Sequence, residues 1–268
     1  MIAIPDIDPV AIYLGPIKIY WYGIAYVVGI ASGWFYIKST NKFYKKRLLA
    51  EEVDDLIFYT ALGAVIGGRI GYCLFYDLHS VISNPLIIFA IWNGGMSFHG
   101  GFLGATFSIL ILSKVYQRHF LEFSDRIVTG LPIGLFLGRI ANFINQELWG
   151  LPSDLPWAVI FSSPLSGGVP RHPSQLYEAF FEGLIIFGVL FLLLKKGCRV
   201  GVLTACFLIL YGIFRFAIEF FREPDLHLGY FFGGTLTLGQ ILTLPMLVLG
   251  VLMIFHPRLK NNKDCIDD

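Results

Sequence analysis

Seven stretches of mostly apolar residues recur along this chain, and they restrict the folds open to it more than any other feature. A helix of about 20 residues is long enough to cross the hydrocarbon core of a bilayer. Each stretch therefore predicts a transmembrane helix, and together they predict an all-α integral membrane protein with seven transmembrane helices. The predicted spans are residues 19–37, 56–76, 96–113, 127–145, 174–194, 200–221 and 235–256.

The composition agrees with this fold class. Apolar residues make up 56% of the chain and charged residues only 15%, a mix typical of integral membrane proteins. Twenty basic residues nearly balance 19 acidic ones and form no broad patch, which argues against nucleic-acid binding. The first apolar run follows a neutral start without a basic region or cleavage site, so we expect a retained helix rather than a signal peptide.

The four cysteines give no sign of a disulfide framework or a zinc site. Cys73 and Cys206 fall inside predicted spans, and no two cysteines have the Cys-x-x-Cys spacing. We therefore expect a protein without a bound metal.

Lysine and arginine collect in alternate connecting segments, which predicts the orientation in the membrane. Short cytoplasmic loops are enriched in these residues. The pattern places the N-terminus outside, the C-terminus in the cytoplasm, and only Lys18, Arg171 and Arg222 in the outer segments. The basic residues assigned to the cytoplasmic side are Lys38, Lys42, Lys45, Lys46, Arg47, Lys114, Arg118, Arg126, Lys195, Lys196, Arg199, Arg258, Lys260 and Lys263.

Two connecting segments have features of their own. Residues 86–92 form a short apolar piece before a glycine pair, which we interpret as a half-helix that ends in a turn. Residues 146–173 form the longest loop and contain five prolines. We expect this loop to be a small extracytoplasmic cap, too short for a separate domain. The whole chain, residues 1–268, is thus predicted to be a single polytopic membrane domain.

Charged and polar side chains interrupt the predicted spans. A charge at the centre of a bilayer costs about 2.5–3.5 kcal/mol or more, so it usually faces a partner, a cavity or a ligand. Arg139 and Asn142, three residues apart, share one helix face. Tyr211, Arg215 and Glu219, four residues apart, form a polar ridge that must point into the bundle. These groups lie toward the predicted outer side and could converge on one cavity.

Each of these groups also has a purely structural interpretation. Arg215 and Glu219 could form a buried ion pair, and Arg69 could anchor the packing of its glycine neighbours. His99 could be a core histidine, and Tyr22 could belong to an interfacial aromatic belt.

Asn142 and Asn145 could likewise join helices through hydrogen bonds. However, three arginines, one histidine and three carboxylates within one small bundle exceed what helix packing requires. A site for an anion is therefore favoured.

The sequence Gly138-Arg-Ile-Ala-Asn-Phe-Ile-Asn-Gln-Glu-Leu-Trp-Gly150 resembles the motif of the bacterial prolipoprotein diacylglyceryl transferases. That motif has Gly-Arg, then Asn-Phe-x-Asn, then Glu and a closing Gly. Phe102-Leu103 replaces two expected aliphatic residues, which is a conservative departure. Four further matches occur in the family's order: Trp21-Tyr22-Gly23, His99-Gly-Gly-Phe-Leu-Gly104, Arg171-His-Pro-Ser-Gln-Leu-Tyr-Glu178 and Tyr211-Gly-Ile-Phe-Arg-Phe-Ala-Ile-Glu219-Phe-Phe-Arg222.

The resemblance implies an activity. Members of this family move a diacylglyceryl group from phosphatidylglycerol to the lipobox cysteine thiol of a prolipoprotein. The reaction forms a thioether, releases glycerol phosphate and begins lipoprotein maturation. The resemblance also implies a multi-pass enzyme of the bacterial cytoplasmic (inner) membrane, without metal or cofactor, whose active site faces the outer leaflet. The implied partners are phosphatidylglycerol, the prolipoprotein signal peptide and other membrane lipids.

The chemistry of this reaction suggests roles for the conspicuous residues. Arg139 and Arg215 are expected to grip the phosphate, with Glu147 or Glu219 holding their guanidinium groups in place. His99 is the candidate general base, while Tyr22 could orient the lipid headgroup instead. The expected phosphatidylglycerol-binding residues are Tyr22, Arg139, Asn142, Glu147, Gly150, Tyr211 and Arg215. The expected supporting residues are Arg69, Asn145, Glu178, Glu219 and Arg222.

Two other functional classes fit the sequence less well. An anion transporter could use the intramembrane arginines, but the odd number of spans and the lack of an inverted repeat argue against it. An intramembrane metalloprotease would need a His-Glu-x-x-His sequence, which the chain lacks.

Overall fold

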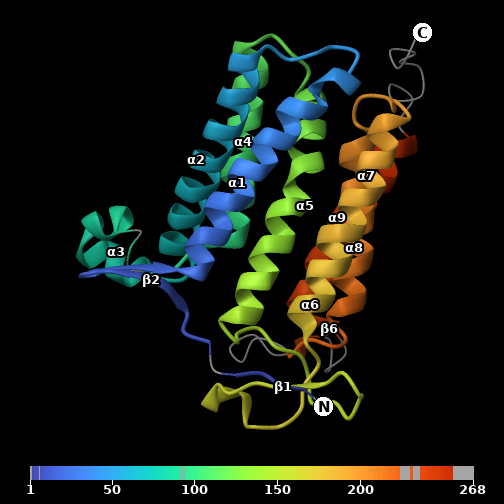
Figure 1. Cartoon of the computed structure of the whole chain (residues 1–268). Helices are drawn as coiled ribbons and strands as arrows, with labels where there is room; N and C mark the ends of the chain where they lie inside the picture. Colours follow the sequence, from blue (N-terminus) through green and yellow to red (C-terminus); the bar gives the residue numbers. More distant parts are fainter. Residues whose placement is uncertain are drawn as a thin grey trace. The chain divides into compact units, whose positions relative to one another are not determined.

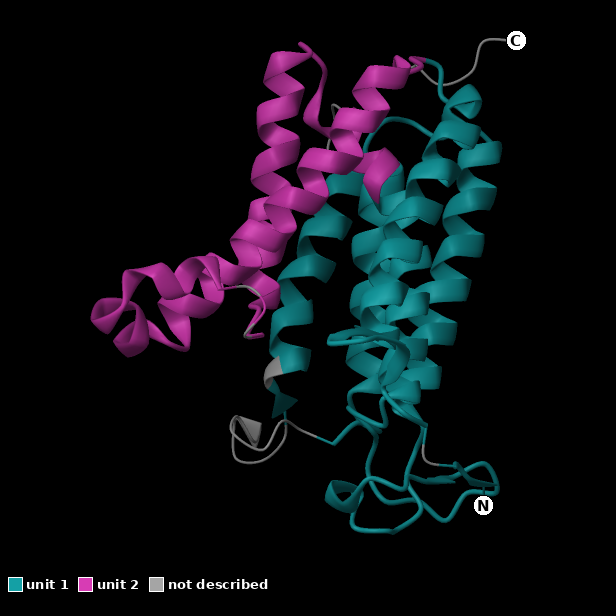
Figure 2. Cartoon of the chain, turned by 60° about the vertical axis from the view of Figure 1, so that its left-hand side comes forward, with its two compact units in different colours: residues 1–45, 128–268 teal, residues 46–127 magenta. Residues whose placement is uncertain are grey.

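The computed structural model describes residues 2–5, 7–90, 92, 94–223, 230–231 and 236–255, without the side chains of residues 230, 231 and 238. Helices make up most of these residues (Figure 1). The chain divides into two compact units (Figure 2). Unit 1 comprises Met1–Lys45 and Val128–Asp268, and unit 2 comprises Lys46–Ile127.

Unit 1 is a helical bundle around an apolar core. Its helices are α1 (Trp21–Thr40), α5 (Phe120–Ile144, from Val128 onward), α6 (Ser174–Glu178), α7 (Ile186–Lys195), α8 (Val202–Ile218) and α9 (Leu238–Phe255). Ile186, Leu190 and Leu194 follow one another at four-residue spacing and therefore share a face of α7. That face packs on Leu203 and Phe207 of α8.

A π-helical segment, Ala179–Ile185, joins α6 to α7. Together they form one helix over Ser174–Lys195, as predicted for residues 174–194. Single π-turns inside α-helices are rare and often occur at functional sites. This one carries Glu182, which is completely buried.

Short strands add to the helices of unit 1 and were not predicted. β1 (Ile2–Ala3) pairs with β4 (Val159–Ile160) in parallel, and β5 (Tyr230–Phe231) pairs with β6 (Leu236–Thr237). β2 (Val10–Leu14) and β3 (Ile17–Tyr20) form an antiparallel hairpin. Because its pairing reaches Tyr20, the first helix begins at Trp21, two residues after the predicted start. Two 3-10 turns, Asn41–Phe43 and Pro164–Ser166, complete the unit.

Unit 2 is built on two long helices, α2 (Ala50–Phe75) and α4 (Phe98–Val115). They pack through glycines: Gly63, Gly67 and Gly71 face Gly100 and Gly104. A Cβ atom built on Gly67 would lie 2.9 Å from Cα of Gly104, so the backbones are in direct contact. Small residues at regular spacing are the usual means by which helices pack in membranes.

The segment between α2 and α4 differs from its prediction. In place of a half-helix over residues 86–92, the structure has α3 (Leu78–Ser83) and a 3-10 helix (Pro85–Phe89). Gly94 and Gly95 then adopt positive φ angles of 76° and 77°, while Ile91 and Asn93 lie outside the described residues. The described backbone is thus a short 3-10 turn and a glycine bend rather than a half-helix.

Arg69 of α2 explains why this irregular backbone is stable. Its guanidinium donates to the carbonyl oxygens of Ile87 at 2.6 Å, Ile88 at 3.3 Å, Gly94 at 2.5 Å and Gly95 at 3.2 Å. Carbonyls outside a regular helix need such partners, especially at membrane depth. Arg69 therefore has a structural role within unit 2.

Each predicted span overlaps a helix of the structure. α2, α4, α5 and the helix Ser174–Lys195 are long and apolar enough to cross a membrane. α8 and Gly239–Phe255 are shorter apolar helices. Some helix ends differ from the predicted ones: α2 starts at Ala50 instead of Leu56, and α8 stops at Ile218 instead of Phe221. The chain is a mostly helical membrane protein.

Candidate active site

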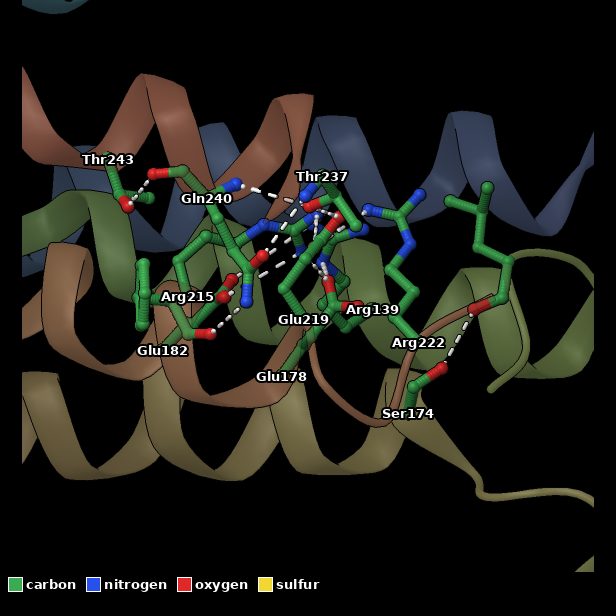
Figure 3. Close-up of polar contacts among 12 residues, drawn as sticks. Arg139, Ser174, Glu178, Glu182, Arg215, Glu219, Arg222, Thr237, Gln240 and Thr243 are labelled. Carbon is green, nitrogen blue, oxygen red and sulfur yellow. Dashed lines mark hydrogen bonds and ion pairs between the residues drawn. The ribbon is translucent and has the colours of Figure 1, made fainter. Parts of the chain in front are cut away.

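Arg139 and Arg215 converge on one buried carboxylate, that of Glu178 (Figure 3). Nε of Arg139 lies 2.6 Å from Oε2 of Glu178, and Nη1 of Arg215 lies 3.0 Å from the same oxygen. The three residues come from α5, α8 and α6. The predicted convergence of these two arginines within unit 1 is therefore present, and Glu178 is its centre.

The polar ridge of α8 continues the cluster. Nη2 of Arg215 lies 2.8 Å from Oε2 of Glu219, one turn further along the helix. The other carboxylate oxygen of Glu219 accepts a 3.0 Å hydrogen bond from the hydroxyl of Thr237. Gly239 leaves room for this carboxylate, because a Cβ atom there would lie 2.7 Å from Oε1 of Glu219. Glu219 thus holds Arg215 in place, as expected.

Arg222 lies at the edge of the same cluster. Its Nη1 is 4.0 Å from Oε2 of Glu219. Burial, opposed in part by the carboxylates nearby, lowers the pKa of Arg222 from its ordinary value.

Glu182 is a member of the cluster to which the sequence had given no role. Its carboxylate oxygens lie 4.0 Å from Nη2 of Arg139 and 3.9 Å from Nη1 of Arg215. Neither oxygen accepts a hydrogen bond within the described part of the chain. The four-residue spacing from Glu178 was the signal that could have identified it, because it places both carboxylates on one helix face.

The amides of the 138–150 motif form a second layer. Nη1 of Arg139 donates to Oδ1 of Asn142 at 3.4 Å, and Nδ2 of Asn142 donates to Oε1 of Glu147 at 2.8 Å. Nδ2 of Asn145 reaches the same oxygen at 3.4 Å. Glu147, which is exposed, orients amides rather than the guanidinium groups that it had been expected to hold.

Gly150 lies where the 146–173 loop meets the end of α8. Its N–H donates to the carbonyl of His172 at 2.9 Å, and a Cβ atom on Gly150 would lie 2.6 Å from Cβ of His172. The backbones of Gly150 and Arg222 form an isolated β-bridge. A residue without a side chain is needed here for backbone contact.

Arg171 belongs to this loop rather than to the arginine cluster. Its guanidinium donates to the carbonyls of Ser166 at 2.8 Å and Gly150 at 3.1 Å, and to Glu223 at 2.9 Å. The indole of Trp149 donates to the same Glu223 oxygen at 2.7 Å. These contacts fasten the loop to the segment that follows α8.

The two tyrosines of the predicted lipid site have different surroundings in unit 1. Tyr211 is buried and stacks on Phe207, with 5.6 Å between ring centroids. Tyr22 is partly exposed, and its hydroxyl lies 3.3 Å from that of Tyr26.

His99 and Arg69 belong to unit 2. His99 occupies the first turn of α4, where its exposed ring makes an edge contact with Phe98. Its predicted part in a site with Arg139 and Arg215 stays a prediction.

The buried cluster is electrically balanced. Arg139, Arg215 and Arg222 carry positive charge, while Glu178, Glu182 and Glu219 carry an equal negative charge when ionised. Buried charges are tolerated only when they are paired in this way. The arrangement preorganises guanidinium groups in a site of low dielectric constant, where they would interact strongly with an anion.

Comparison with known proteins identifies the family. The model of the family described as "Prolipoprotein diacylglyceryl transferase" matches residues 9–256. A Brucella anthropi protein named phosphatidylglycerol–prolipoprotein diacylglyceryl transferase is 46% identical over 98% of this chain and 96% of its own. A Nitratidesulfovibrio vulgaris protein of the same name is 49% identical over 95% and 96%. The chain belongs to the prolipoprotein diacylglyceryl transferase family.

Proposed function

We propose that this protein transfers the diacylglyceryl group of phosphatidylglycerol to the lipobox cysteine of prolipoproteins. The observation that carries the proposal is the pair Arg139 and Arg215, held by one buried carboxylate within residues 9–256, which match the family. The names of the relatives state the same lipid and protein substrates.

The two guanidinium groups supply the binding site for the lipid phosphate. A guanidinium is planar, stays charged in a dry site and can donate two parallel hydrogen bonds to phosphate oxygens. Glu178 fixes Arg139 and Arg215 relative to each other, so the two guanidinium groups need little further ordering when the lipid binds. Asn142 adds a neutral polar group beside Arg139. Tyr22, Glu147, Gly150 and Tyr211 complete the proposed headgroup site.

The reaction is a displacement at a glyceryl carbon. The cysteine sulfur attacks that carbon, the carbon–oxygen bond to phosphate breaks, and its electron pair stays on the phosphate oxygen. The thiol proton must leave, and we assign its removal to His99. The phosphate gains negative charge during this step, so fixed positive charge at Arg139 and Arg215 stabilises the transition state.

We propose the following placement in the membrane. The chain is a single polytopic domain of the cytoplasmic membrane with seven crossings, the N-terminus outside and the C-terminus in the cytoplasm. Residues 146–173 form a cap at the outer leaflet, where lipid and signal peptide meet the site. The distribution of basic residues supports this orientation. Modification of single cysteines by a membrane-impermeant reagent from either side tests it.

Mass spectrometry tests the activity. The purified protein is incubated with phosphatidylglycerol and a lipobox peptide, and the peptide is examined for a diacylglyceryl group on cysteine. We expect an adduct with the wild-type protein and with Arg47→Gln, because Arg47 is exposed and remote in sequence from the motifs. We expect none above background with Arg139→Gln or Arg215→Gln. Absence of the adduct from the folded wild-type protein would contradict the proposal.

A further inference from the structure

Glu182 is a buried carboxylate that the displacement reaction does not require. It lies in the π-helical segment, and the structure leaves it no exposed surface. The titratable or charged groups around it are Arg139 of α5, Tyr211 and Arg215 of α8, Glu178 one turn earlier, and Arg222 beyond α8.

The charge balance of the cluster changes when a lipid binds. Three guanidinium groups offset three ionised carboxylates before binding. The phosphodiester of phosphatidylglycerol brings one more negative charge into the same buried region. An uncompensated buried charge is costly, so protonation of one carboxylate would restore the balance.

Geometry distinguishes which carboxylate would take the proton. Glu178 lies 2.6 Å and 3.0 Å from two guanidinium nitrogens, and Glu219 lies 2.8 Å from a third. Both would lose close ion pairs on protonation. Among the described residues, Glu182 is no nearer than 3.9 Å to a guanidinium nitrogen. Protonation of Glu182 would therefore weaken the fewest close ion pairs.

We propose that Glu182 takes up one proton from solvent when the phosphatidylglycerol headgroup binds to Arg139 and Arg215. The inference rests on the proposed function and adds to it a positioning residue that keeps the occupied site neutral. Binding breaks no covalent bond, so the complex differs from the free protein only by the bound lipid and one proton. Affinity for the lipid should consequently fall as pH rises.

Binding without peptide tests this directly. The dissociation constant for phosphatidylglycerol in nanodiscs is measured from about pH 6 to about pH 9, a range in which the lipid diester does not titrate. If one proton is taken up on binding, the wild-type dissociation constant should rise by up to about tenfold for each unit by which the pH rises. Glu182→Gln, which mimics the protonated carboxyl, should bind with little pH dependence and more tightly than wild type at the alkaline end.

Matched variants assign the proton to this position. Glu182→Asp keeps a carboxyl and should keep the pH dependence. Glu51→Gln removes an exposed carboxylate to which no role in the site is assigned, and should also keep the pH dependence. The proposal is overturned if the wild-type dissociation constant does not change with pH, or if Glu182→Gln retains the wild-type slope.

Calorimetry of the wild-type protein covers the case in which Glu182→Gln does not fold. Titrations in two buffers with different ionisation enthalpies count protons, and we expect up to one taken up per lipid bound. A count of zero across the pH range overturns the proposal. Lipid binding and peptide modification without proton uptake would refute this inference alone, whereas absence of both would refute the proposed function as well.

Discussion

Arg139 of α5 and Arg215 of α8 lie against the same oxygen of Glu178, at 2.6 Å and 3.0 Å. Two like charges held this close are stable only because the buried carboxylate lies between them. The pair is thereby built before any lipid arrives. Preorganisation of this kind is the main means by which an enzyme lowers the barrier to a step that develops negative charge.

Replacement of Glu178 by Gln should therefore damage both folding and turnover. Removing one partner of a buried ion pair costs about 3–5 kcal/mol, and here two arginines lose their partner. We expect a lower unfolding temperature and at least a ~100-fold slower formation of the peptide adduct. Rates are compared by mass spectrometry on protein that elutes as a single folded species. A wild-type rate for Glu178→Gln would show that the shared carboxylate is not needed.

The arginines should also resist conservative replacement. Lysine keeps the charge of Arg139 but cannot donate in a planar fork to both a carboxylate and a phosphate. We predict that Arg139→Lys lowers kcat by about 10- to 100-fold. Arg47→Lys, at an exposed position, serves as the control and should leave the rate unchanged.

The glycine contact between α2 and α4 should determine the stability of unit 2. A methyl group at Gly67 would meet Cα of Gly104 at 2.9 Å, so Gly67→Ala must push the helices apart. We expect destabilisation of about 1–3 kcal/mol. Gly188→Ala provides the control, since a Cβ atom there meets nothing within 4 Å. Equal unfolding temperatures for the two variants would contradict the packing.

Loss of the Arg69 guanidinium should loosen the segment between α2 and α4. Arg69→Gln leaves carbonyls of Ile87, Ile88, Gly94 and Gly95 without their donor, at about 1–3 kcal/mol for each buried group left unpaired. Faster proteolysis and hydrogen exchange of residues 85–95 should follow. Arg69→Lys should restore part of the protection. Unchanged exchange in Arg69→Gln would exclude this role.

Stability should depend on pH through His172, which lies outside the helices. Burial lowers the pKa of His172 from its ordinary value near 6.5. The unfolded chain therefore takes up the proton first as pH falls. The contribution of His172 to stability is fully present above about pH 6.5 and is lost as pH falls through the folded-state pKa. His172→Gln should flatten the pH dependence of the unfolding temperature in this window, and an unchanged slope would contradict the shift.

The sequence predicted the parts of the site that depend on spacing within one helix. Tyr211, Arg215 and Glu219 share a face of α8, as four-residue spacing requires, and Arg139 reaches Asn142 three residues later. Spacing could not tell which carboxylate meets an arginine from another helix. Glu147 was therefore expected at the guanidinium groups, where the structure places Glu178 and Glu182.

Other features were beyond the sequence for similar reasons. The partners of Arg69 are backbone carbonyls of an irregular segment, which side-chain patterns do not reveal. The β2–β3 hairpin leads directly into an apolar helix, so its last two residues, Ile19 and Tyr20, were included in the predicted span. The positions of the long helices could be predicted because each requires only a continuous apolar stretch.

The most direct test of the account is a double-mutant cycle on Arg139 and Arg215. Adduct formation on a lipobox peptide is measured for wild type, Arg139→Gln, Arg215→Gln and the double variant. If both arginines bind one phosphate, each single substitution should slow transfer by about 100-fold or more. The rate loss of the double variant should then be far smaller than the product of the two single losses. Transfer at the wild-type rate by either single variant, or fully multiplicative losses in the double variant, would contradict the claim that both arginines bind the same phosphate.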